Sequence, residues 1–332
     1  MISLKELHTF GFDSLAESLI EIVHRDQLVP TFRTLKGQQY YLLGEGSNSV
    51  FLEDYLGTIV LNKLSGIQRH QDDAFFYLSV ASGEPWHELV KSTLSMGIYG
   101  FENLALIPGT VGAAPIQNIG AYGVEIGTFI ESVEYFDIDS SSFILISGDD
   151  CKFKYRDSIF KNALFQKAVI TQVNFKLPKK NVVEQTYAPL NQLTDPSPLD
   201  IFNEVVKVRS EKLPDPKKLG NAGSFYKNPI VTIKQFEKIQ TRYESVPHFR
   251  VDKTNVKIPA AWLIDQLGYK GKSCLGVKCH ERQPLVLVNE GNGNGKGLLM
   301  LARKIKLDVS QNFSIDLENE VRLVGNNGLV NL

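Results

Sequence analysis

The fold of this chain is decided by one stretch, Ile107-Pro108-Gly109-Thr110-Val111-Gly112-Ala113-Ala114-Pro115-Ile116-Gln117-Asn118-Ile119-Gly120-Ala121-Tyr122-Gly123. The stretch holds four glycines and two prolines in seventeen residues and has no charged side chain. A regular helix or strand does not tolerate so much glycine and proline. A backbone with such small side chains can lie against a large flat group such as a cofactor. It can also form a tight turn between two core strands. The stretch by itself favours the turn, and the residues around it decide between the two.

The composition excludes several classes of protein. The 332 residues are enough for two or three domains, and 43% hydrophobic with 22% charged residues is ordinary for a soluble globular chain. A net charge of -1 gives no field to recruit nucleic acid or a membrane surface. No apolar run is long enough to span a bilayer, and the first residues lack a signal-peptide pattern. Three cysteines without metal-ligand spacing indicate reduced thiols, so we expect a cytoplasmic protein without a metal.

The spacing of hydrophobic residues, together with capping residues and glycines, predicts the secondary structure. Helices are expected, with Asp13 and Ser14 capping the first, over residues 13–23, 86–95, 200–209, 260–267 and 298–309. Strands are expected over 39–43, 57–61, 75–81, 132–138, 143–147, 168–177, 285–289 and 315–323. Gly97 and Gly268 are placed to end two of the helices, and residues 178–180 are typical of a boundary.

Two further glycine-rich segments follow predicted strands. Gly44-Glu45-Gly46-Ser47-Asn48 can present several backbone N–H groups to a phosphate, although it lacks the Lys-Ser/Thr ending of a P-loop and the full dinucleotide fingerprint. Residues 291–297 have three residues rather than four between Gly291 and Gly295-Lys296, with no Ser or Thr after the lysine. We therefore expect residues 291–297 to form a flexible polar loop.

Three polar segments have ordinary interpretations when each is taken alone. Arg156 and Asp157, within Tyr155-Arg156-Asp157-Ser158, are typical of a surface ion pair. Ser224, within residues 220–229, is typical of a turn, and the charges of residues 315–323 are typical of the solvent side of a strand. The residues alone leave these interpretations open.

Taken together, the stretches resemble one family, the UDP-N-acetylenolpyruvoylglucosamine reductases, also called UDP-N-acetylmuramate dehydrogenases. The resemblance covers nearly the whole chain, from Thr9-Phe10-Gly11 to the last strand. Its specific parts are Gly44-Glu45-Gly46-Ser47-Asn48, residues 107–123, Tyr155-Arg156-Asp157-Ser158, residues 220–229, Trp262-Leu263-Ile264-Asp265 and Glu320-Val321-Arg322. Tyr187 matches the tyrosine of a mobile loop that closes over the nucleotide substrate in the longer subtype of the family.

The resemblance implies an α+β fold. An FAD-binding region of the vanillyl-alcohol-oxidase (PCMH) type would span residues 13–180, as two subdomains of roughly 1–65 and 66–205. An α+β substrate-binding domain would follow over 206–315. The C-terminal strand, within 316–332, would return to the flavin site.

The resemblance also implies the reaction. NADPH would reduce FAD, and flavin N5 would give hydride to C3 of the enolpyruvyl group of UDP-N-acetyl-3-O-(1-carboxyvinyl)-glucosamine. A proton at C2 would complete UDP-N-acetylmuramate, a peptidoglycan precursor. By resemblance Ser224 donates that proton, Arg156 holds the substrate carboxylate, and Glu320 helps to stabilise the enol form.

The remaining site residues are implied by the same match. FAD contacts are expected from Gly44, Glu45, Gly46, Ser47, Asn48, Pro108, Gly109, Thr110, Gly112, Ala113, Gln117, Asn118, Gly120, Ala121, Tyr122, Gly123 and Arg209. Contacts with the UDP-sugar are expected from Tyr187, Lys212, Asn228 and Gln283. NADPH would be the co-substrate, and the family precedent favours a monomer with no metal, nucleic-acid or membrane partner.

A few positions depart from the family pattern. His8 stands where Asn is expected, Asn319 stands where Pro is common, and residues 112–114 vary in their small side chains. Two alternatives are another FAD-dependent oxidase or dehydrogenase on the same scaffold and a non-catalytic flavin- or nucleotide-binding protein. The presence of Arg156, Ser224 and Glu320 together argues against both.

Overall fold

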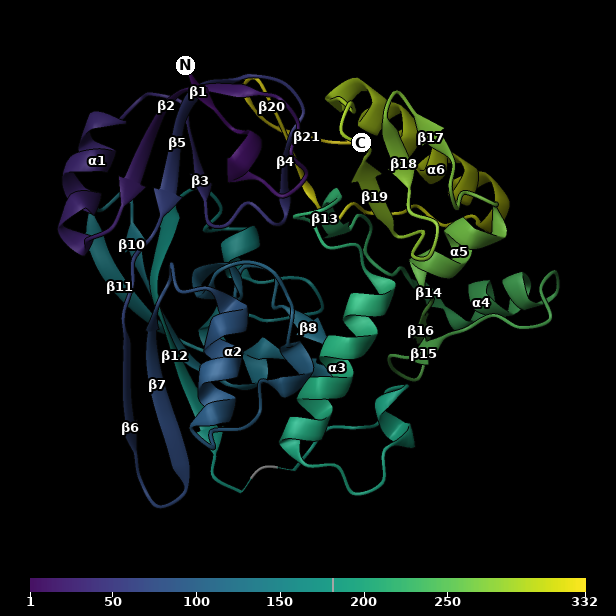
Figure 1. The fold of residues 1–332 in the computed structure, drawn as a ribbon, viewed down its shortest axis with the longest axis horizontal. Coiled ribbons are helices and arrows are strands. Elements are labelled where there is room, and N and C mark those ends of the chain that lie inside the picture. The colour runs from purple at the N-terminus through teal and green to yellow at the C-terminus, as the bar shows by residue number, and fades with distance from the viewer. Residues whose placement is uncertain (181) are drawn as a thin grey trace. The chain divides into compact units, whose positions relative to one another are not determined.

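The computed structural model describes residues 1–180 and 182–332, and the chain divides into two compact units. Unit 1 comprises Met1–Ala16, Gly46–Leu56 and Lys212–Leu332. Unit 2 comprises Glu17–Glu45 and Gly57–Glu211, so residues 178–180 lie within it. Figure 1 labels the elements along the chain. In the described part of the chain, no helix is both long and apolar enough to cross a membrane.

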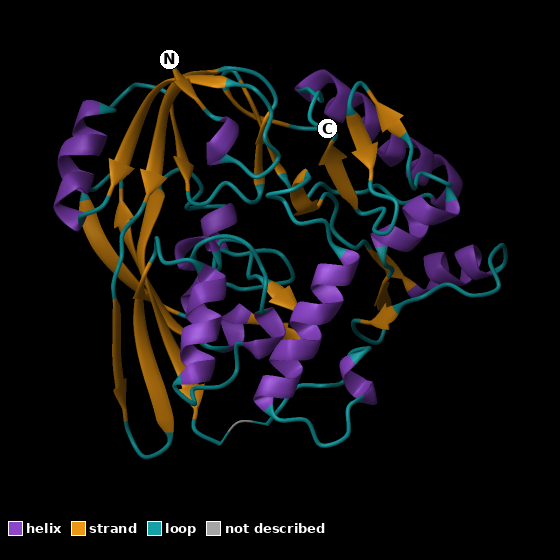
Figure 2. Cartoon of the chain, in the orientation of Figure 1, coloured by secondary structure: helices purple, strands orange, loops and turns teal. Residues whose placement is uncertain are grey.

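Unit 2 is built on a five-stranded antiparallel sheet with the order β11-β10-β12-β7-β6, whose long strands are seen in Figure 2. The strands are β6 (Ile67–Gln71), β7 (Phe75–Ala81), β10 (Ile130–Asp137), β11 (Ser142–Ser147) and β12 (Ala168–Pro178). In β12 the buried side chains Val173, Phe175 and Leu177 alternate with more exposed ones, because successive residues of a strand face opposite sides of its sheet. One face of this sheet therefore packs into a core that also contains Trp86 and Phe101.

The other elements of unit 2 surround this core and a second, smaller one. They are most of β2 (Leu15–Ile22) and β5 (Tyr55–Asn62), with β3 (Tyr40–Leu43), β8 (Gly120–Ala121), β9 (Val124–Glu125), α1 (Leu28–Thr34), α2 (Trp86–Ser95) and α3 (Pro198–Lys212). Strands β3 and β5 pair in parallel, and β2 lies beside β5. The aromatic ring of Phe32 in α1 packs against Tyr40 and Phe136 in the smaller core.

Unit 1 contains three α-helices and many short strands. The helices are α4 (Ile233–Gln240), α5 (Ala260–Gln266) and α6 (Gly295–Phe313). The strands are β1 (Ile2–Ser3), β4 (Ser49–Phe51), β13 (Gly220–Ser224), β14 (Ile230–Thr232), β15 (Phe249–Arg250), β16 (Asn255–Lys257), β17 (Ser273–Cys274), β18 (Val277–Cys279), β19 (Val286–Asn289), β20 (Arg322–Gly325) and β21 (Gly328–Val330). Helix α6 buries Leu298, Leu301, Ala302 and Ile305, which recur at helical spacing, and it packs against α5, β17 and β18.

Two sheets of unit 1 bring distant parts of the sequence together. One has the order β13-β19-β18-β17, and another has the order β21-β20-β4. Strand β20 pairs in parallel with β4, so that Arg322 lies opposite Ser49. The C-terminal residues therefore lie beside the residues that follow the glycine-rich turn at 44–48.

Most of the expected elements are confirmed within a few residues. These are the strands expected at 39–43, 57–61, 75–81, 132–138, 143–147, 168–177 and 285–289, and the helices expected at 86–95, 200–209, 260–267 and 298–309. Gly97 and Gly268 follow two of the helices with φ of +71° and +65°, the left-handed conformation that ends a helix at little cost for glycine.

The helix expected over residues 13–23 is wrong, because these residues form the strand β2. Leu15, Leu19 and Ile22 are spaced as on a helix, but Ala16 and Ile22 are buried while Glu17 and Glu21 are exposed. Even-numbered side chains thus face inward with the period of two that a strand requires. The pattern fits both periods, and pairing with neighbouring strands decides the outcome.

Two other expectations need correction. The strand expected over 315–323 begins only at Arg322, and before it a single bridge joins Asn319 to Tyr226. The loop expected over 291–297 ends early, because Gly295 begins α6 and the Asn294 side chain caps that helix by accepting from the Gly297 N–H at 2.9 Å.

Candidate active site

The predicted site residues fall in both units. Unit 2 holds Gly44, Glu45, Pro108, Gly109, Thr110, Gly112, Ala113, Gln117, Asn118, Gly120, Ala121, Tyr122, Gly123, Arg156, Tyr187 and Arg209. Unit 1 holds Gly46, Ser47, Asn48, Lys212, Ser224, Asn228, Gln283 and Glu320.

Backbone N–H groups of the glycine-rich stretch in unit 2 bond to neighbouring segments. The Gly109 N–H donates to the Glu45 carboxylate at 2.7 Å, and the Gly112 N–H donates to the Ser82 carbonyl at 2.8 Å. A Cβ on Gly112 would lie 2.5 Å from the Cβ of Ser82, closer than side-chain atoms pack. The glycine is therefore required by the packing of the protein itself, which fixes the path of the stretch.

The end of the stretch is a β-hairpin formed by β8 and β9. Its two turn residues, Tyr122 and Gly123, have φ of +47° and +89°, as a type I′ turn requires. Asn118, with 1% of its surface exposed, supports the hairpin: its amide donates to Glu125 and to the Lys154 carbonyl and accepts from the Gly127 N–H. The Asn118 side chain thereby ties the hairpin to the segment at Lys154.

Arg156 lies in a tight turn beside this hairpin. Lys154 and Asp157 exchange backbone hydrogen bonds at 3.1 Å each, and Arg156 between them has φ of +53°. Its Nη2 donates to the Gly120 carbonyl at 2.8 Å, and the Ser158 hydroxyl donates to the Ile116 carbonyl at 2.7 Å. The Asp157 carboxylate accepts from Asn162, so the segment positions the guanidinium on the glycine-rich stretch.

A second guanidinium lies near the same hairpin. Arg209, on α3, donates from Nη2 to the Leu106 carbonyl at 3.3 Å, and its buried Nε has no hydrogen-bond partner in the described chain. Burial lowers the pKa of Arg209, nearby Tyr122 raises it, and the positive charge of Arg156 lowers it further. Arginine stays protonated despite such shifts, so two cations and an unsatisfied donor favour an anionic ligand here.

Tyr187 lies over the tip of the hairpin. A Cβ on Gly123 would lie 3.0 Å from Cδ2 of Tyr187 and 3.0 Å from Cγ of Glu184. The buried side chain of Asn103 donates to the carbonyls of Tyr122 at 2.9 Å and Glu184 at 2.8 Å. Sequence reasoning missed Asn103, and its only signal is a polar pair, Glu102-Asn103, between apolar residues just before the glycine-rich stretch.

In unit 1, Ser224 is positioned by a β-bulge. The pairing of β13 with β19 shifts register between Asn221 and Ser224, where Gly223 has φ of +70°. Bulges of this kind redirect a side chain and are frequent next to active sites. The Ser224 side chain is half-buried, and its hydroxyl is hydrogen bonded to none of the described residues.

The backbone of Glu320 is hydrogen bonded to Phe225, the residue that follows Ser224. The Glu320 N–H donates to the Phe225 carbonyl at 2.8 Å, and its carbonyl accepts from the Asn48 side chain at 3.3 Å. The Arg322 N–H donates in turn to the Asn48 carbonyl at 2.9 Å. Unit 1 thus gathers the predicted proton donor, the predicted acid and one of the predicted FAD contacts.

The glycine-rich turn at 46–48 offers donors for a phosphate. A Cβ on Gly46 would lie 2.0 Å from the Leu7 carbonyl oxygen, and Gly46 has φ of +68°, so only glycine fits. Within the described residues, the N–H groups of Gly46 and Ser47 have no hydrogen-bond acceptor. Unpaired backbone donors of this type suit the pyrophosphate of a dinucleotide.

The other predicted substrate residues of unit 1 are arranged around the same segments. Asn228 accepts from the Ala260 N–H at 2.9 Å at the start of α5, which orients its amide. Gln283 is half-buried and its carbonyl accepts from Val286, the partner of Ser224 in the sheet. Lys212 is exposed at the end of α3.

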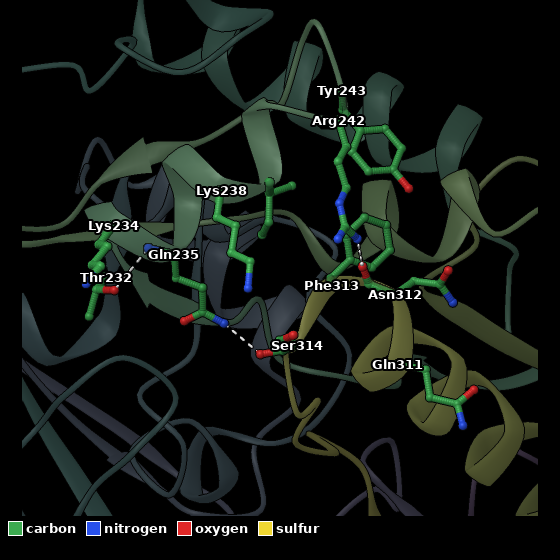
Figure 3. A pocket seen from close by; sticks show the side chains of 11 residues that line it. Thr232, Lys234, Gln235, Lys238, Arg242, Tyr243, Gln311, Asn312, Phe313 and Ser314 are labelled. Carbon is green, nitrogen blue, oxygen red and sulfur yellow. Dashed lines mark hydrogen bonds between the residues drawn. The ribbon is translucent and has the colours of Figure 1, made fainter.

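A pocket of about 330 Å³ elsewhere in unit 1 contains none of the predicted site residues (Figure 3). It lies between α4 and the end of α6, where Gln235 donates to the Ser314 carbonyl at 2.6 Å and Arg242 to the Asn312 carbonyl at 3.4 Å. Lys238 also points into it. Donors and cations stabilise the unpaired carbonyls at a helix C-terminus, which accounts for this cluster without a ligand.

Comparison with known proteins identifies the cofactor and the family. Residues 18–141 match the FAD binding domain family. The chain is therefore a flavoprotein, an oxidoreductase with FAD as its cofactor. Residues 215–324 match the C-terminal domain of UDP-N-acetylenolpyruvoylglucosamine reductase.

Full-length relatives define the family. The UDP-N-acetylenolpyruvoylglucosamine reductase of Pseudoalteromonas atlantica is 51% identical over 328 residues, which cover 99% of this chain and 95% of the relative. That of Escherichia coli strain K12 is 42% identical over 332 residues, covering 99% and 97%. The chain belongs to the UDP-N-acetylenolpyruvoylglucosamine reductase family, as the resemblance predicted.

A solved structure confirms the fold class. The UDP-N-acetylenolpyruvylglucosamine reductase of Thermus caldophilus superposes with a TM-score of 0.67 at 23% identity, covering 97% of each chain. The expected combination of an FAD-binding region and a C-terminal α+β domain is therefore confirmed, while the roles of individual site residues stay predictions.

Proposed function

We propose that this enzyme reduces UDP-N-acetyl-3-O-(1-carboxyvinyl)-glucosamine to UDP-N-acetylmuramate, with NADPH as reductant, in the synthesis of peptidoglycan precursors. The observation that carries the proposal is the backbone hydrogen bond from Glu320 to Phe225, next to Ser224. It joins Glu320 to the residue that follows Ser224 in the chain, although the two segments are far apart in the sequence. The third, Arg156, is fixed on the glycine-rich stretch.

Bound FAD would supply, from N5, the hydride that adds to C3 of the enolpyruvyl group. This addition builds negative charge at C2, which spreads into the conjugated carboxylate. Arg156 would hold that carboxylate, because a guanidinium presents a fixed fork of donors and a permanent positive charge. The bonds of the Arg156 turn to Gly120 and Ile116 keep this cation in place before the substrate arrives.

Ser224 would deliver the proton to C2. A serine hydroxyl is a weak acid, so it must be directed at the carbon that takes the proton, and the bulge at Gly223 gives it a fixed direction. Glu320 would stabilise the enol form of the substrate by hydrogen bonding. These two side chains rise from segments that are bonded to each other, which supports a joint role.

The binding roles follow the same arrangement. Residues 13–180 would hold FAD, with the N–H groups of Gly46 and Ser47 on its pyrophosphate and Arg209 near the glycine-rich stretch. The domain over 206–315 would hold the UDP-sugar, and residues 316–332 would return Glu320 to the site. The UDP-sugar would be contacted by Tyr187, Lys212, Asn228 and Gln283. We also propose that the enzyme acts in the cytoplasm as a monomer, on small molecules only.

An anaerobic experiment tests the function. The purified protein should be yellow, NADPH should bleach it, and the enolpyruvyl UDP-sugar should restore the colour with formation of UDP-N-acetylmuramate. NADH serves as the comparison for the choice of reductant. A reduced enzyme that the enolpyruvyl UDP-sugar does not reoxidise would show that this compound is not the substrate.

A further inference from the structure

The buried side chain of Asn103 joins two segments that are far apart in the sequence. Asn103 lies in the short helix Glu102–Leu104 with 2% of its surface exposed. Its Nδ2 donates to the Tyr122 carbonyl at 2.9 Å and to the Glu184 carbonyl at 2.8 Å. Both N–H bonds of one amide are thereby used, one on the β8–β9 hairpin and one on the segment that leads to Tyr187.

That segment is shaped to place Tyr187 on the hairpin. The Glu184 carboxylate accepts from the Thr186 N–H at 2.8 Å and from the Thr186 hydroxyl, which forms a compact turn before Tyr187. Gly123 leaves room for this turn, since a Cβ there would lie 3.0 Å from both Glu184 and Tyr187. The position of Tyr187 thus depends on Glu184, and the position of Glu184 depends on Asn103.

We propose that Asn103 is a positioning residue that holds Tyr187 over the glycine-rich hairpin and so controls the affinity for the UDP-sugar. The proposal rests on the proposed function, in which Tyr187 contacts that substrate. Asn103 itself is buried and does not react. Its effect therefore appears in KM rather than in the rate of the chemical step.

The first test is Asn103→Asp, which keeps the shape of the side chain and removes both donors. An ionised carboxylate facing two carbonyl oxygens cannot hold them, so the 184–187 segment is released. We expect KM for the enolpyruvyl UDP-sugar to rise about tenfold, equivalent to about 1.4 kcal/mol. The value of kcat per bound FAD should change less than threefold. Asn203→Asp, at an exposed position of α3, is the matched control and should change nothing.

A second measurement does not depend on activity. Hydrogen exchange of the backbone amides at 184–187 should become at least tenfold faster in Asn103→Asp, while exchange within β12 stays the same. Where the aspartate variant fails to fold, Asn103→Ser replaces it, because the shorter side chain adds no charge and does not reach the two carbonyls. Unchanged exchange at 184–187 in a folded variant would overturn the proposal.

A double-mutant cycle decides whether Asn103 acts through Tyr187. Tyr187→Ala should raise KM, and adding Asn103→Asp to it should raise KM no further. Independent, multiplying effects would show that Asn103 acts elsewhere and would overturn the proposal. If Tyr187→Ala leaves KM unchanged while exchange at 184–187 still rises in Asn103→Asp, the substrate contact of Tyr187 is wrong, but Asn103 still positions the segment.

Discussion

The two regions that carry the candidate residues differ in what they present. In unit 2, the stretch 107–123 presents backbone, and its buried Asn118 side chain fixes it by hydrogen bonds to Lys154 and Gly127. In unit 1, Ser224 and Glu320 present side chains from a bulge and from an irregular segment before β20. The difference indicates that flavin binding and the reaction with the substrate can be lost independently of each other. Changes in the first region should cost flavin or fold, whereas changes at Ser224 or Glu320 in the second should cost one half of the reaction.

The largest expected effect is in the second region, at Ser224. We expect Ser224→Ala to slow reoxidation of the reduced enzyme by the enolpyruvyl UDP-sugar about 10²–10⁴-fold, the usual contribution of a general acid. FAD content and reduction by NADPH should stay within about twofold, because the hydroxyl is hydrogen bonded to none of the described residues. Anaerobic stopped-flow absorbance of the flavin measures both steps.

The control for this variant is Ser273→Ala, at an exposed position of β17 in the same unit. It should leave both steps unchanged. Near-normal reoxidation of Ser224→Ala would show that another group donates the proton. The proposed separation of flavin binding in the first region from proton transfer in the second would then be wrong.

The next effect is in the first region, at Gly112. We expect Gly112→Ala to lower the free energy of unfolding by about 1–3 kcal/mol, because its Cβ would overlap Ser82. FAD content should fall with it, in contrast to Ser224→Ala. Thermal unfolding and the flavin-to-protein absorbance ratio provide the measurements.

Gly37→Ala separates packing from backbone strain. Gly37 has φ of +76°, and no atom lies within 4 Å of the Cβ that alanine would add. Its cost should be about 1–2 kcal/mol from conformation alone, without loss of FAD. Equal FAD loss in both variants would mean that general destabilisation, not the path of the glycine-rich stretch, governs flavin binding.

The sequence predicted the long strands and helices well because their patterns are local. It predicted a helix at 13–23 because Leu15 and Leu19 fit a helical period as well as a strand period, and only the pairing of β2 decides between them. It predicted no strand at 220–224, since glycine and asparagine disfavour strands, and the ladder to β19 overrides that preference. Tertiary pairing therefore explains both errors.

The candidate site was predictable only in part. Family resemblance identified Arg156, Ser224 and Glu320. Without it, their local sequence indicates only a surface ion pair, a turn serine and a solvent-side charge. Asn103 could not be found, because its carbonyl partners lie 19 and 81 residues away. A residue whose role depends on long-range hydrogen bonds leaves almost no local pattern.

A smaller effect in the first region concerns Arg209. We expect Arg209→Lys to weaken FAD retention about tenfold, because lysine keeps the charge but not the planar set of donors, of which Nη2 bonds to the Leu106 carbonyl. FAD fluorescence on dilution measures the release. Arg33→Lys, at an exposed position of α1, should retain FAD normally. Normal retention in Arg209→Lys would restrict the flavin contacts of this region to backbone.

The smallest effect concerns the support of the 46–48 turn in the second region. His8 has 3% of its surface exposed, lies against the ring of Phe51, and contacts the backbone at Gly46 so closely that no Cβ fits there. Burial lowers the pKa of His8 from 6.5 to about 4, and backbone bonds to Phe12 and Ser49 oppose this shift. The folded protein thus keeps the ring neutral in a pH range where the unfolded chain takes up a proton.

The sign of the pH dependence follows from that difference. The contribution of a neutral His8 is fully present above pH 6.5 and is lost as the pH falls toward 4, because the unfolded state then binds one more proton. We expect a loss of about 1 kcal/mol between pH 6.5 and 5.5, measured by denaturant unfolding. His8→Asn should remove this part of the slope while carboxylates titrate alike in both proteins. Parallel pH profiles would show that His8 takes up its proton without disturbing the turn at Gly46, and the second region would then be no more sensitive to acid than the first.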